Sequence, residues 1–179
     1  MKSLLFLLMS VLGVFQLLML KHPYFSSDEA INGFFGLESL RLLSQGRLPP
    51  LTPMMPYLGP LDGWLFGAMT ALPRYFSWIE PGPALMRILP LLCHWFGAFW
   101  MARELAHRDR WLAWAYGLMA MVLPMNGAYA SFGWSPSFCL GFFSFLWAEA
   151  LRGARTGKPR WILMCLVSGI SMEFHPVSA

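Results

Sequence analysis

The strongest constraint in this sequence is a series of apolar runs separated by short segments rich in arginine. The runs cover residues 4–20, 84–102, 111–125, 138–151 and 161 to about 172. The chain is 57% hydrophobic and 12% charged, whereas a soluble domain carries about 25% charged residues. The sequence therefore predicts an all-α, polytopic membrane protein with about five spans, built as one transmembrane module over residues 1–179.

The basic residues set the expected orientation of these spans. They gather in residues 103–110 and 152–160, and Lys2 precedes the first run. Because basic loops stay in the cytoplasm, this distribution places the N-terminus there and both basic segments on the same side. The net charge of +4 follows from these loops, so we expect the bilayer as a partner and no nucleic acid.

Residues 21–83 then form a long first outer loop with two juxtamembrane helices. Residues 26–45 have an amphipathic pattern, and Gly46 is suited to end the helix. One face would carry Ile31, Phe34, Phe35 and Leu42. The second helix would cover residues 59–72, whose uncharged part of ten residues is too short for a crossing of about 20 residues.

Two adjacent carboxylates, Asp28 and Glu29, follow the first apolar run. Acidic groups held at a membrane face are costly, which favours a functional role. A structural interpretation is equally available. Ser26 and Glu29 fit a capping box that satisfies free amides at the start of the next helix. Asp28 would then interact with the positive end of the helix dipole.

Other ionisable residues have the same two interpretations. Arg87 either extends to lipid headgroups or binds a phosphate through two hydrogen bonds. Asp62 could cap the second juxtamembrane helix. Glu173 and His175 either lie at the interface or are functional groups at depth. The three cysteines, Cys93, Cys139 and Cys165, lack metal-ligand spacing and are expected to pack as small residues.

The layout, together with several short motifs, resembles the polytopic GT-C glycosyltransferases. The most similar groups are the protein O-mannosyltransferases and the lipid A aminoarabinose transferases. The motifs are Asp28-Glu29-Ala30, the sequence YLGPLDGW at residues 57–64, LMRILP at residues 85–90 and AREL at residues 102–105. The Asp-Glu step combined with the following Gly-Pro-Leu is the most specific of them.

This resemblance implies transfer of a sugar from a polyprenyl-phosphate donor to an unidentified acceptor, in some family members with a divalent metal such as Mg²⁺ or Mn²⁺. It makes Asp28 the candidate catalytic residue and Glu29 its neighbour. Donor-binding candidates are Arg87, Asp62, Glu173 and His175. It also implies a bacterial inner membrane, with transfer at the outer face.

Two departures from the family keep other functions open. The chain is shorter than these enzymes, so we expect an N-terminal portion, and residues 126–137 lack the second acid of some relatives. A small transporter or channel subunit would use Glu149 and Glu173 as intramembrane charges. A non-catalytic membrane scaffold is the third possibility.

Overall fold

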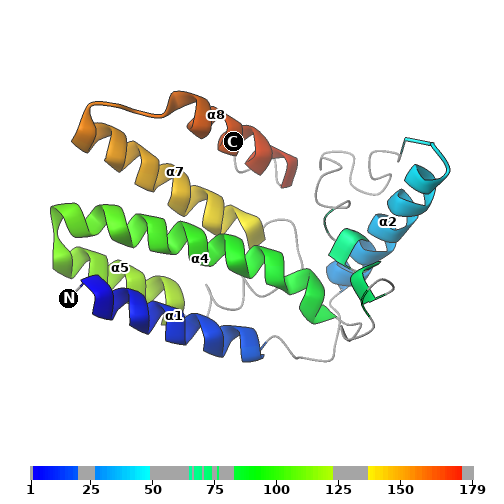
Figure 1. Cartoon of the computed structure of the whole chain (residues 1–179), viewed down its shortest axis with the longest axis horizontal. Coiled ribbons are helices and arrows are strands. Elements are labelled where there is room, and N and C mark those ends of the chain that lie inside the picture. Colours follow the sequence, from blue (N-terminus) through cyan, green and yellow to red (C-terminus); the bar gives the residue numbers. More distant parts are fainter. Residues whose placement is uncertain are drawn as a thin grey trace.

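The computed structural model describes residues 2–19, 27–48, 83–122 and 137–174, together with residues 65, 67–69, 71–73 and 76. The helices are α1 (Lys2–Met19), α2 (Ser27–Ser44), α4 (Pro83–Arg108), α5 (Arg110–Val122), α7 (Ser137–Thr156) and α8 (Trp161–Phe174). Figure 1 shows α4 in the middle of the bundle, with α1 and α5 on one side and α7 and α8 on the other. α2 lies at the end where α4 begins.

Each of the five predicted apolar runs is helical over the residues that the structure describes, but the prediction that they span a membrane is wrong. Within the described ranges, no helix is both long enough and apolar enough for a crossing. α5 and α8 have 13 and 14 residues, short of the roughly 20 that a span needs. α1 begins at Lys2, and its 18 residues rise about 27 Å, below a bilayer core of about 30 Å.

The two longer helices differ from spans in their charges. α4 continues beyond the predicted end at Ala102 through Arg103 and Glu104 to Arg108, and α7 includes Glu149, Arg152 and Arg155. The predictions of a polytopic membrane fold, of juxtamembrane interface helices and of an inner-membrane location with a cytoplasmic N-terminus all depended on spans. Because no such span is found among the described helices, these predictions are wrong as well.

The largest core lies between α1, α4 and α5. It is made of small and medium apolar side chains, namely Leu5, Met9, Ala98, Ala102, Leu105, Ala113, Ala120 and Met121. The alanines let the helix backbones approach, so Leu5 and Met9 of α1 reach full burial.

Polar side chains satisfy the end of α5 inside this core. The last four carbonyl groups of a helix have no partner within it. Gln16 donates its amide to the carbonyl of Met121 at 2.8 Å, and Nε2 of His94 lies 3.0 Å from the carbonyl of Ala120. The indole of Trp95 in turn donates to Oε1 of Gln16 at 2.9 Å. Three helices are thereby joined through two buried carbonyls.

α2 confirms one part of the amphipathic prediction and corrects another. Gly46 has φ of 70°, and the amide of Arg47 bonds the carbonyl of Leu42 at 2.9 Å, which is the hydrogen bond of a glycine helix end. Leu42 is buried, but Phe34 is 71% exposed, so these two residues do not share one buried face. Gly67, which is helical, packs closely on α2: a Cβ on Gly67 would overlap the backbone of Gly36.

The first predicted basic loop is almost entirely helical. α4 ends at Arg108 and α5 begins at Arg110, so only Asp109 separates them. Oδ1 of Asp109 accepts hydrogen bonds from the amides of Trp111 at 2.7 Å and Leu112 at 3.4 Å. Asp109 is therefore the N-cap of α5.

Candidate functional site

The structure places the two candidate catalytic acids in the first turn of α2. That helix begins at Ser27, so Asp28 and Glu29 are its second and third residues. Their side chains lie outside the described part of the chain, as does Ser26. The helix start agrees with the capping interpretation, and the catalytic interpretation stays a prediction.

Arg87 is the donor-binding candidate that the structure describes best. It lies in the second turn of α4 and is 5% exposed, and the residue takes part in an interaction. A guanidinium this buried does not extend into solvent, so the headgroup interpretation of Arg87 is wrong. Burying a charge is costly without a partner, and the interaction that Arg87 makes offsets that cost.

The remaining candidates are largely outside the described residues. Asp62 and His175 lie outside them, and Glu173 is in the last turn of α8 with its side chain undescribed. The contact between α2 and α4 brings the elements that carry Asp28 and Arg87 together. Among the described side chains, no three His, Cys, Asp or Glu residues are grouped to hold a metal ion.

A charged cluster centred on Glu149 lies towards the opposite end of α4. The Glu149 side chain is fully buried, and it accepts hydrogen bonds from the indole of Trp100 at 2.7 Å and from Nε of Arg152 at 2.9 Å. Arg160 binds the same carboxylate with Nε, at 2.8 Å, and with Nη2. Helices α4 and α7 and the residue before α8 therefore meet at one carboxylate.

The electrostatics of this cluster favour the ionised acid. Burial acts to raise the pKa of Glu149, but the hydrogen bonds from Arg160, Arg152 and Trp100 outweigh it and hold that pKa below its usual value. Two guanidiniums surround one carboxylate, so the cluster retains one uncompensated positive charge. Arg103 adds another near the ring of Trp100, with its Cζ 5.2 Å from the ring centroid.

A second buried acid pairs α4 with α7 nearby. Arg155 donates to Oε2 of Glu104 at 2.7 Å, and Glu104 is 5% exposed. Neither pair is predicted when residues 103–110 and 152–160 are interpreted as basic loops. The i,i+3 spacing of Glu149 and Arg152 on a helical continuation of the apolar run was the available signal.

An apolar groove begins at this cluster and runs along α4, α7 and α8. Its volume is about 400 Å³. Aromatic side chains form most of its walls. Its lining includes Phe96, Trp100, Phe142, Phe145, Leu163 and Val167, with Arg160 at one end.

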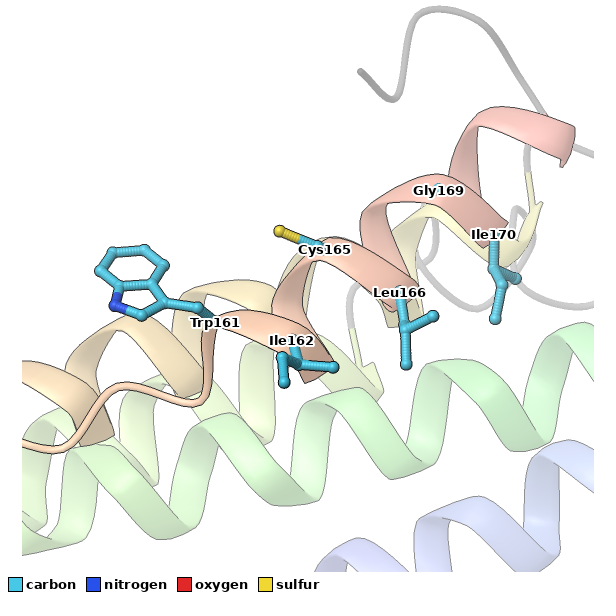
Figure 2. Close-up of a pocket in the computed structure, with 6 residues that line it drawn as sticks. All are labelled: Trp161, Ile162, Cys165, Leu166, Gly169 and Ile170. Carbon is cyan, nitrogen blue, oxygen red and sulfur yellow. The ribbon is translucent and has the colours of Figure 1, made fainter.

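The opposite side of α8 is apolar but does not form an enclosed site. Figure 2 shows Trp161, Ile162, Cys165, Leu166, Gly169 and Ile170 along this helix. Ile162 is 79% exposed. All six residues come from a single helix, and among the residues that the structure describes no second element lines this surface.

Comparisons with models of known protein families, with curated proteins and with solved structures find no match for this chain. The resemblance to GT-C glycosyltransferases therefore rests on the motifs of the sequence.

Proposed function

We propose that the chain takes part in glycosyl transfer from a polyprenyl-phosphate-linked sugar to a hydroxyl or amine acceptor. The observation that carries this proposal is the burial of Arg87 at the end of the bundle where α2 meets α4. α2 supplies Asp28 and Glu29 in its first turn. The segments that carry Arg87 and the two acids are far apart in sequence and belong to helices that contact each other.

Arg87 has the chemistry required for the donor. A guanidinium offers several fixed donors and can bind a phosphate through two parallel hydrogen bonds. A donor phosphate would join or replace the present partner of Arg87, and it would be held in surroundings that exclude water. Such surroundings strengthen the electrostatic interaction with the charge that develops on the leaving phosphate.

Asp28 has the chemistry required for the acceptor. The acceptor oxygen or nitrogen forms a bond to the anomeric carbon while the bond from that carbon to the phosphate oxygen breaks. The electron pair stays on the lipid phosphate, which needs no proton, and the acceptor proton passes to the Asp28 carboxylate. The carboxylate of Glu29 would add negative charge beside Asp28.

The test is Asp28→Asn, which is nearly isosteric and keeps an oxygen suited to a helix start. We expect transfer from a polyprenyl-phosphate sugar to fall by about 10²-fold or more, the typical size of a general-base contribution. Asp109→Asn is the matched control, because Asp109 is also an acid at a helix start and has no assigned chemical role. It should retain full transfer.

Helical content and thermal stability are measured beside activity in both variants. Near-normal transfer by a folded Asp28→Asn protein would assign Asp28 to helix capping alone and would overturn the proposal. Equal loss of transfer in Asp28→Asn and Asp109→Asn would also overturn the proposal, because the loss would not be specific to Asp28.

A further inference from the structure

The groove between α4, α7 and α8 combines an aromatic interior with a cation at one end. The ring of Phe96 stacks on that of Trp100 at a centroid distance of 5.7 Å and an interplanar angle of 24°, and on that of Phe145 at 5.6 Å and 26°. Leu163 and Val167 of α8 line the groove as well. Its volume of about 400 Å³ is at the lower end of the roughly 300–1,000 Å³ of small-molecule sites.

Arg160 gives this groove a polar end. Its guanidinium uses Nε and Nη2 on Glu149, and within the described part of the chain no hydrogen bond is recorded for Nη1. The side chain is 43% exposed and lines the groove. The cluster around Glu149 also retains a positive charge, so this end of the groove is complementary to an anion.

We propose that the groove binds a single-chain aliphatic anion of the fatty-acid class. The chain would lie against Phe96, Phe142 and Val167, and the carboxylate would accept hydrogen bonds from the free edge of Arg160. The limited volume favours one chain over a two-chain lipid. The aromatic walls exclude a strongly polar ligand, because its polar groups would be left without hydrogen bonds.

This inference does not rest on the proposed glycosyl transfer. Trp100 follows Arg87 by 13 positions on α4, a rise of about 20 Å along the helix axis. Asp28→Asn should therefore leave fatty-acid binding unchanged, and loss of fatty-acid binding would leave the transfer proposal standing.

Binding is tested with the full chain at neutral pH by displacement of the fluorescent fatty acid parinaric acid. Palmitate should displace it at least 10-fold more effectively than hexadecanol, which has the same chain without the charge. Hexadecyl phosphate tests the other anionic headgroup. If it displaces better than palmitate with the same dependence on Arg160, the assignment to the fatty-acid class is overturned.

Two variants test the two ends of the groove. Arg160→Gln should weaken palmitate binding at least 10-fold and leave hexadecanol unchanged. Lys158→Gln is its control, because it removes a charge from the same segment and does not line the groove. Val167→Trp should fill the groove and weaken both ligands at least 10-fold, whereas Ile162→Trp on the outer side of α8 (Figure 2) should weaken neither.

The proposal is overturned if palmitate fails to displace the probe, or if palmitate and hexadecanol compete equally. It is also overturned if Val167→Trp binds as the unmodified chain does. Circular dichroism checks that each variant is helical. Should Arg160→Gln lose its helical signal, the comparison of Val167→Trp with Ile162→Trp decides the result alone.

Discussion

Gly97 of α4 and Gly141 of α7 meet backbone to backbone. A Cβ placed on Gly97 would overlap the carbonyl oxygen of Gly141, and a Cβ on Gly141 would overlap the carbonyl of Cys93. Besides these backbone atoms, Sγ of Cys93 lies 2.6 Å from the position of a Cβ on Gly141. The two glycines therefore set the distance between α4 and α7, and with it the width of the groove beside them.

We expect Gly97→Ala to lower the free energy of unfolding by about 1–3 kcal/mol, because the added methyl group must push two backbones apart. Urea denaturation measures this change. Gly169→Ala in α8 is the control, since among the described residues no atom outside the backbone of α8 lies within 4 Å of the position its Cβ would take. It should gain up to about 1 kcal/mol from helix propensity alone. Equal effects in the two variants would show that the crossing is not tight.

The sequence was sufficient to locate the helices and insufficient to say what covers them. Each of the five apolar runs is helical over its described residues, and Gly46 ends α2 as predicted. The runs were interpreted as spans because hydropathy does not show where a helix ends. α4 continues six residues beyond Ala102, into charges that the sequence analysis assigned to a loop.

The candidate site was less predictable for a related reason. Glu149 was noted as an isolated charge, but Arg160 lies 11 positions away and Trp100 49 positions away. Such pairings depend on how helices cross, which local patterns do not specify. The role of Arg87 in donor binding stays a prediction, and its burial depends on the packing of the first turns of α4, which local sequence does not specify.

We expect the N-cap at Asp109 to stabilise the short connection between α4 and α5. Asp109→Ala removes the carboxylate that accepts from the amides of Trp111 and Leu112, and should destabilise the fold by about 1 kcal/mol. Asp109→Ser should restore most of this loss, because serine is also a good N-cap. Thermal denaturation of the unmodified chain, of Asp109→Ala and of Asp109→Ser measures these differences in stability. If Ala and Ser behave alike, the cap contributes nothing.

His94 should make stability depend on pH. Burial lowers its pKa, and the bond to the Ala120 carbonyl only partly offsets this. Because the unfolded value of about 6.5 is higher, the unfolded chain binds the proton first as pH falls. Stability is therefore full above about pH 6.5 and decreases as pH falls from there through the folded pKa.

The measurement is the free energy of unfolding across this range for His94→Gln, whose amide can still donate to Ala120. This variant should lose the slope below about pH 6.5. His107→Gln, at an exposed position, should keep it. A slope that survives His94→Gln would assign the pH dependence to another group.

Removal of the Glu149 charge should lower the free energy of unfolding more than removal of any other charge. Glu149→Gln leaves Arg152 and Arg160 facing a neutral amide, and breaking a buried ion pair typically costs about 3–5 kcal/mol. We expect about 3 kcal/mol, because both arginines retain some contact with solvent. Glu38→Gln breaks an exposed pair with Arg41 at the same i,i+3 spacing, so it is the matched control and should be near neutral.

The pH dependence of the unmodified chain gives a second readout of Glu149. Its pKa is lowered in the folded state, so its contribution is fully present above the unfolded value of about 4.3 and is lost as pH falls through the folded value. Glu149→Gln should reduce the acid-induced loss of stability below about pH 4.3, and Glu38→Gln should reduce it less. If the two variants cost the same stability at neutral pH, the three-way contact at Glu149 does not hold α4, α7 and the start of α8 together.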